Sequence, residues 1–423
     1  MQKNETAESS VLRRRICAAW RTRACAAGLC VGAQVFLLGS GIAMPLCLNS
    51  AWMAALIALP ACAAAVWACR RALLQDTESA GGAEPLPYRA GSGYKERNAR
   101  PRGTEPAGGA EPLPYRAGSG YKERNARPRG TEPAGGAEPL PYRRARYILL
   151  ALTLAANAAL ALAALVSLAE QSLLTQAQTL FSAGAATAAA LLCALSRSTG
   201  VSRLCFALRF ALPIALALLT ASSVPLEIPA GLFPIWGAGA LPLAVACACM
   251  LSAAAPVLML LLPPPELEEI DGALRKEFIP GTGFFLSRVL PGAAFGCLLL
   301  FVLSVCSTYE SIAAQKTWGE RLRILSSGQP HEGIGQALLA VCQMLALLLL
   351  AVSQLCAAEQ ALVRVLPRLA RLRTGLLLLT ALLALCLLAL IVFGFDKALF
   401  AAAWLALPSA LCLLLPGRKG KNA

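Results

Sequence analysis

Two short stretches combine small residues with a proline inside apolar segments, and both could expose backbone polar groups. The first is GSGIAMP, from Gly39 to Pro45, and the second is SAAAP, from Ser252 to Pro256. Proline has no N–H, so Pro45 and Pro256 cannot donate to the carbonyls four residues earlier, which belong to Gly41 and Ser252. We therefore predict that a helix opens at both places.

An opened helix at Gly39–Gly41 would leave four free N–H groups at the start of a second half-helix, those of Ser40, Gly41, Ile42 and Ala43. Such a terminus carries about half a positive charge and favours a carboxylate. The carbonyls of Gly41 and Ser252 could accept hydrogen bonds from an ammonium group. The expected ligand is a small zwitterion such as an amino acid. The candidate binding residues are Gly39, Ser40, Gly41, Ile42, Ser252 and Ala253, with Pro45 and Pro256 as helix breakers.

The alternative is that these residues serve packing. Glycine and proline are frequent in membrane helices, where small residues let two helices approach closely. Matching interruptions in two halves of a chain, however, point to a binding site. Both interpretations remain open at this stage.

The elements that would position these residues are membrane-spanning helices. The chain has 423 residues, of which 57% are hydrophobic and only 14% charged, and this composition is typical of a membrane protein. Stretches of about 20 apolar residues predict ten spans. They cover residues 27–48, 51–69, 147–168, 178–195, 204–222, 240–262, 286–307, 336–356, 374–394 and 398–415.

The distribution of lysine and arginine predicts the orientation of the ten spans. With the N-terminus inside, 32 of these residues lie on the cytoplasmic side and four lie outside. Both termini are therefore expected in the cytoplasm, with a basic head at 1–26 and a basic tail at 416–423. The net charge of +15 is then juxtamembrane charge facing anionic lipid, and no nucleic-acid partner is needed to explain it.

A repeat interrupts the cytoplasmic loop at 72–146, between the first two spans (27–71) and the other eight (147–415). Residues 81–107 recur unchanged at 108–134, and a partial third copy occupies 135–143. The repeat shows no apolar face at any period, so we expect it to be disordered.

Catalytic and metal-binding chemistry finds little support in the sequence. Most of the sixteen cysteines lie in or beside apolar spans, no C-x-x-C occurs, and the single histidine, His331, has no neighbouring ligands. None of the ten spans contains Asp or Glu, which proton-coupled carriers use to relay protons. We expect no enzyme activity, no metal and no cofactor.

Several segments resemble a known family. GSGIAMPL resembles the first-helix motif of the amino acid–polyamine–organocation (APC) transporter superfamily. Residues 193–263, which include ALSRSTGVSRLC and end at Pro263, and the loop STYESIAAQKTWGERLRILSS are similar to the endospore germination permeases, the B subunits of germinant receptors. The resemblance implies an all-α LeuT-type fold, in which ten transmembrane helices form a 5+5 inverted repeat with helices 1 and 6 broken. By analogy the third helix flanks the site, which adds Asn157 to the candidate ligand-binding residues.

The resemblance also implies a function. A membrane subunit of a germinant receptor would bind a small germinant, an amino acid, at the broken helices. It would signal to a membrane-anchored A subunit and a lipoprotein C subunit in the inner membrane of the spore. The alternatives are an APC-type amino acid carrier and a structural membrane subunit with a degenerate pocket. The lack of acids in the spans favours the receptor over the carrier.

Overall fold

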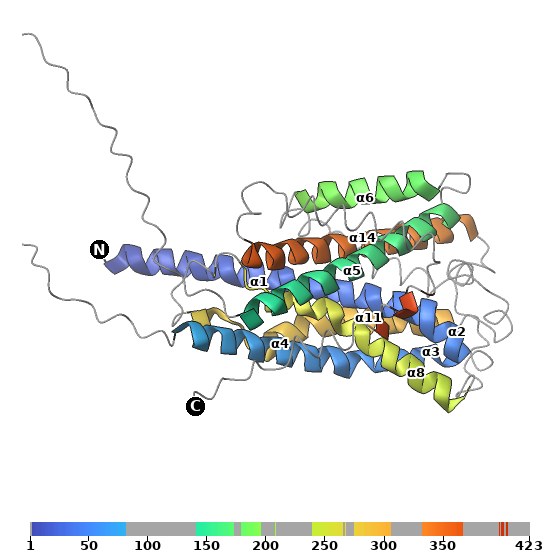
Figure 1. Cartoon of the computed structure of the whole chain (residues 1–423), viewed down its shortest axis with the longest axis horizontal. Helices are drawn as coiled ribbons and strands as arrows, with labels where there is room; N and C mark the ends of the chain where they lie inside the picture. The colour runs from blue at the N-terminus through green and yellow to red at the C-terminus, as the bar shows by residue number, and fades with distance from the viewer. Residues whose placement is uncertain are drawn as a thin grey trace, which may run out of the picture.

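The computed structural model describes residues 2–81, 141–172, 179–195, 239–264, 275–305 and 332–366, with single positions or short pieces at 208, 267, 397, 399–401 and 403–404. All regular secondary structure in these ranges is helical (Figure 1). The tandem repeat at 82–140, the predicted spans 204–222 and 374–394, nearly all of 398–415, and the tail 416–423 lie outside the described residues.

The first two predicted spans form a series of helical pieces. They are α1 (Gln2–Leu38), η1 (Gly39–Ala43), α2 (Met44–Cys47), η2 (Leu48–Ser50), α3 (Ala51–Leu56) and α4 (Ala58–Gly81). The remaining helices are α5 (Pro141–Ser172), α6 (Thr179–Leu195), α8 (Ala240–Leu251), η4 (Ser252–Leu261), η5 (Lys276–Phe278), α11 (Thr282–Val305) and α14 (Glu332–Val365).

Six helical segments in the described residues are long and apolar enough to cross a membrane. They are Val11–Cys47, Ala51–Gln75, Ala145–Ala169, Ala240–Leu261, Lys276–Ser304 and Val341–Val365. They overlap predicted spans one, two, three, six, seven and eight, so the chain is a helical, multi-pass membrane protein. Predicted span four is the helix α6, whose described apolar part, Ala183–Leu192, is shorter than the other six.

The predicted basic head is not separate from the first span. α1 begins at Gln2, and Ile16, Trp20 and Ala24 have no exposed surface. These residues recur every four positions and so form an apolar stripe on one face of the helix. This stripe holds the N-terminal half of α1 in the bundle from Ile16 onward.

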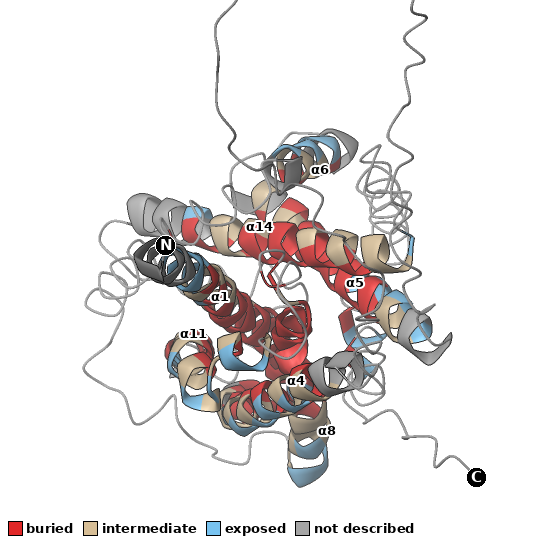
Figure 2. Cartoon of the chain, turned by 90° about the vertical axis from the view of Figure 1, so that its left-hand side faces the viewer, coloured by how far each residue is buried: buried red, intermediate tan, exposed pale blue. Residues whose placement is uncertain are grey.

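The helices form two groups (Figure 2). One group contains α1, α3, α4, α8 with η4, and α11, and the other contains α5, α6 and α14. α1 also packs against α14, and this contact joins the two groups.

Glycines at one crossing let α1 and α11 approach to backbone contact. A Cβ atom on Gly32 would overlap the carbonyl of Gly292, and one on Gly296 would overlap the carbonyl of Gly32. Gly28 meets the backbone of Arg288 in the same way. Residue numbers rise together along the two helices, so they run parallel. Each helix carries one G-x-x-x-G motif, and this spacing places small residues on one face of a membrane helix.

Arginines join three elements at one end of the bundle. The Arg23 guanidinium on α1 donates hydrogen bonds to the carbonyl of Leu262, directly after η4, and to Gln360 Oε1 on α14 at 2.9 Å. Arg364 donates to the carbonyl of Pro263 at 3.3 Å. Carbonyls at a helix C-terminus have no partner within the helix, and cations there are favourable.

Candidate functional site

The helix of span one changes geometry where the sequence predicts an interruption. Gly39–Ala43 form a π-helical turn, and the N–H of Met44 donates to the carbonyl of Gly39. All five residues of the turn are buried. The helix therefore continues through η1 and does not open into two half-helices as we expected. In a π turn each N–H donates to the carbonyl five residues earlier instead of four. This shift by one residue accommodates Pro45, which has no N–H to donate.

The first span leaves helical geometry nine residues after Gly39. Leu48 has φ of 56° and ψ of −127° and is the one non-glycine residue with positive φ in the described part of the chain. A leucine in this region is strained, typically by 1–3 kcal/mol. The connection from α2 into the second span therefore bends at Leu48.

The helix of span six also changes geometry where predicted. α8 ends at Leu251, and Ser252–Leu261 continue as a 3₁₀ helix with Pro256 inside it. In this geometry the donor lies three residues on, so the carbonyl of Ser252 faces the N–H of Ala255, and the carbonyl that loses its donor to Pro256 is that of Ala253. Ten residues is long for a 3₁₀ helix, because runs beyond three or four residues are uncommon.

The two interruptions lie on neighbouring elements. η1 packs against α8, and α1 packs against η4. Ser40 is fully buried and donates its hydroxyl to the carbonyl of Phe36 at 2.7 Å. Ser252 donates to the carbonyl of Cys249 at 2.6 Å. Both hydroxyls are thus bonded within their own helices, and Ile42 and Ala253 are buried beside them.

Asn157 lies apart from the interruption in span one, although its helix α5 packs against η4. The guanidinium carbon of Arg364 on α14 lies over the Tyr147 ring on α5, 5.5 Å from the ring centre. The two helices run antiparallel (Figure 1). Asn157 lies ten residues beyond Tyr147, and Gln354 lies ten residues before Arg364. The two amides are therefore at the same height along the pair of antiparallel helices. The bond from Arg23 to Gln360 places this level about six residues beyond Arg23 on α1, which is about ten residues, or about 15 Å, before Gly39.

Two polar residues that the sequence analysis did not single out share that level. Ser353 and Gln354 are 3% and 0% exposed, and the Ser353 hydroxyl and both Gln354 amide atoms have no hydrogen-bond partner. The Asn157 Nδ2 atom is also without a partner. Unpaired polar groups inside a protein are costly, so each calls for a ligand, a water or a functional reason. The signal in the sequence was the polar pair Ser353-Gln354 within an apolar run.

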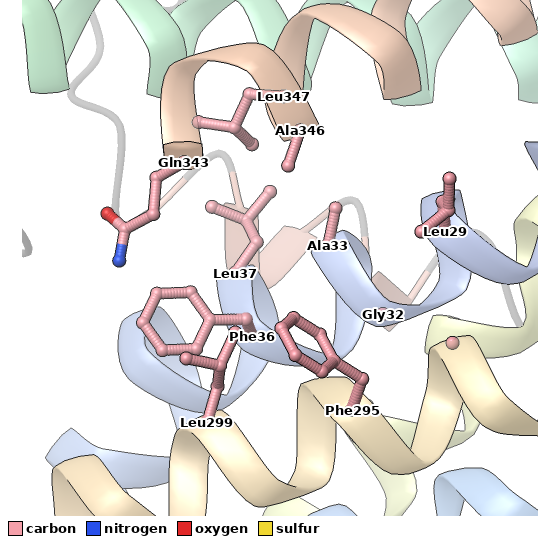
Figure 3. A pocket seen from close by; sticks show the side chains of 11 residues that line it. Leu29, Gly32, Ala33, Phe36, Leu37, Phe295, Leu299, Gln343, Ala346 and Leu347 are labelled. Atoms are coloured by element: carbon pink, nitrogen blue, oxygen red, sulfur yellow. The ribbon is translucent and has the colours of Figure 1, made fainter. Parts of the chain in front are cut away.

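A pocket lies beside the interruption in span one, between α1, α11 and α14 (Figure 3). Its empty volume is about 520 Å³, counting the open space at its mouth. The lining residues are Leu29, Gly32, Ala33, Phe36, Leu37, Gly292, Phe295, Leu299, Gln343, Ala346 and Leu347. Gln343 is the one polar side chain among them. It is 7% exposed, and its Nε2 atom has no partner.

No group of three His, Cys, Asp or Glu side chains that could hold a metal occurs among the described residues. All eleven cysteines whose side chains are described are free thiols. Three amides within the spans, Gln34, Asn157 and Gln343, are each less than a tenth exposed, and Gln343 lines the pocket with Phe36 and Leu37, directly before η1.

Comparison with models of known protein families and with curated proteins finds no match to this chain. The fold and the site geometry therefore carry the functional argument.

Proposed function

We propose that the chain is the membrane subunit of a germinant receptor, which binds a small germinant, an amino acid, where spans one and six are interrupted. The observation that carries the proposal is the loss of α-helical geometry at both predicted positions, at η1 and at η4. A π turn inside a membrane helix and a long 3₁₀ stretch are both features that frequently mark functional sites and hinges.

The helix contacts support an inverted repeat. In a 5+5 repeat, spans one, two and three are the counterparts of spans six, seven and eight. The first group of helices contains the pairs one/six and two/seven, and the second contains the pair three/eight. Span one (α1) packs against span seven (α11). The contact that the repeat relates to it, between span two (α4) and span six (η4), is also present. This pair of contacts is related as a 5+5 repeat would relate it.

The ligand would act by changing the geometry of the interruptions. In the closed arrangement Ser40 and Ser252 are bonded to their own helices. An amino acid would stabilise an open form, in which its carboxylate takes N–H groups of residues 40–42 and its ammonium takes the carbonyls of Gly41 and Ser252. A ligand that binds the open form more tightly shifts the population toward it. The A subunit and the lipoprotein C subunit would respond to this shift.

Spores that carry Gly41→Leu in place of the native residue test the proposal. Each of the twenty amino acids is supplied alone, and germination is followed as the loss of spore refractility. Gly41→Leu should abolish the response while the protein still accumulates, because a leucine side chain would fill the buried turn. The matched control is Gly184→Leu on α6, where a Cβ atom meets nothing within 4 Å.

Three results would overturn the proposal. An unchanged dose response in Gly41→Leu would remove the site and favour a structural subunit. Transport of labelled amino acid into liposomes by the purified chain alone would favour the carrier. Failure of the chain to co-purify from spore membranes with a membrane-anchored protein and a lipoprotein would remove the receptor assembly.

A further inference from the structure

The pocket between α1, α11 and α14 has a chemistry that an amino acid zwitterion does not fit. The described residues that line it are apolar apart from Gln343, and none of them is charged. An ionised carboxylate or ammonium group buried there would lose its hydration without a counter-charge, and this is strongly unfavourable. The pocket therefore selects for an uncharged ligand.

Gln343 is the polar side chain of the pocket and lies at the end beside Phe36 and Leu37 (Figure 3). The Nε2 atom is a donor, it is buried, and it lacks an acceptor. Because this atom has almost no exposed surface, the amide has to turn toward the pocket before the oxygen of a ligand, such as a ketone or an ester, can accept from it. Satisfying a buried donor is favourable because an unpaired one costs about 1–3 kcal/mol.

The rim of the pocket is reached from the side of the bundle. Leu29, Ala33, Phe295, Leu299 and Ala346 are partly exposed, although they line it. All three helices lie in candidate membrane spans, so in a bilayer the exposed part of the rim would face lipid. A ligand can then enter from the bilayer, where apolar molecules concentrate.

From this geometry we infer a second binding site, which takes a small, uncharged, mostly apolar molecule with one hydrogen-bond acceptor. The acceptor bonds to Gln343 Nε2, and the apolar part lies along α1 from Leu37 toward Leu29. The pocket occupies the helix face formed by Leu29, Ala33 and Phe36–Leu37, and the next turn of that face is Ser40–Gly41. Occupancy therefore presses on α1 directly before the π turn.

A photoreactive ketone tests the inference. The full chain in phospholipid nanodiscs is labelled with a diazirine derivative of 2-octanone, and the labelled residues are mapped by mass spectrometry. Label should concentrate on residues 29–37, 292–299 and 343–347. Unlabelled 2-octanone should compete about fivefold better than 2-methyloctane, in which a methyl group replaces the oxygen, because a neutral hydrogen bond contributes about 1 kcal/mol.

Two substitutions and one control complete the experiment. Ala346→Phe fills the pocket and should remove most of the label from it, whereas Ala294→Phe, on an exposed position of α11 outside the pocket, should not. Gln343→Leu keeps the size of the side chain and should abolish the advantage of the ketone over the hydrocarbon.

Label spread evenly over lipid-facing residues would overturn the inference. So would equal losses in Ala346→Phe and Ala294→Phe, or an advantage of the ketone that survives in Gln343→Leu. A gain in stability of Gln343→Leu in the presence of saturating 2-octanone would show that the amide stays unpaired, and it would overturn the assigned hydrogen bond.

Discussion

The backbone contact between α1 and α11 makes Gly292→Ala a sensitive test of the fold. The added methyl group would overlap the backbone carbonyl of Gly28, and a backbone atom cannot rotate away as a side chain can. The two helices must therefore move apart, and that motion loosens the packing along the whole crossing.

The magnitude follows from two opposing effects. Overpacking a close contact costs about 1–3 kcal/mol, and the upper end applies because backbone meets backbone. Alanine is the better helix former by up to about 1 kcal/mol, which offsets part of this cost. We expect a net loss of about 2 kcal/mol, which raises the unfolded fraction about thirtyfold.

The assay is unfolding of the purified protein by increasing sodium dodecyl sulfate in mild detergent micelles, followed by far-ultraviolet circular dichroism. The matched control is Gly184→Ala on α6, which faces open space and should be neutral or slightly stabilising. Gly32→Ala combined with Gly292→Ala should cost less than the sum of the two, because the first substitution has already separated the helices. If Gly292→Ala is as stable as Gly184→Ala, the reasoning from the crossing is refuted.

Three further substitutions or deletions give separate predictions. Arg23→Met should destabilise the protein by about 1.5–3 kcal/mol in the same assay, because it removes the charged donor to the Leu262 carbonyl, while Arg21→Met at an exposed position should have little effect. Pro256→Ala should let η4 become α-helical and shorten it by about 5 Å over its ten residues, which paired spin labels at 251 and 262 would detect as a shorter distance. Deletion of residues 81–134 should leave the amount of folded protein on size-exclusion chromatography unchanged, since the repeat carries no apolar face; a clear loss would contradict the interpretation as a linker.

The course of the membrane spans could be predicted from composition because a span needs little more than length and hydropathy. The six helices described as candidate spans all fall on predicted segments. The positions of the two interruptions could also be predicted, because Pro45 and Pro256 lack a donor wherever they lie in a helix. The geometry that each helix would adopt at its proline could not be predicted. The π turn and the 3₁₀ stretch are both ways to re-pair the carbonyls, and the neighbouring helices select between them.

The arrangement of the candidate site was harder to foresee. Asn157 was placed by analogy with the third helix, and the register of α5 against α14 instead sets it level with Gln354, away from η1. Gln343 lies nearer to η1 because α14 runs antiparallel to α1. Register between helices depends on which side chains interlock, and a single sequence does not carry that information.

The amino-acid sequence by itself determined that this chain is a multi-pass helical membrane protein, and it located the two proline-linked changes of helix geometry, because both follow from local chemistry along the chain. Only the tertiary structure decided that Gly28, Gly32, Gly292 and Gly296 form one crossing, that Arg23 caps the end of η4, and that an apolar pocket opens beside Gln343. These features are made by residues more than two hundred positions apart. They exist only where packing brings their helices together.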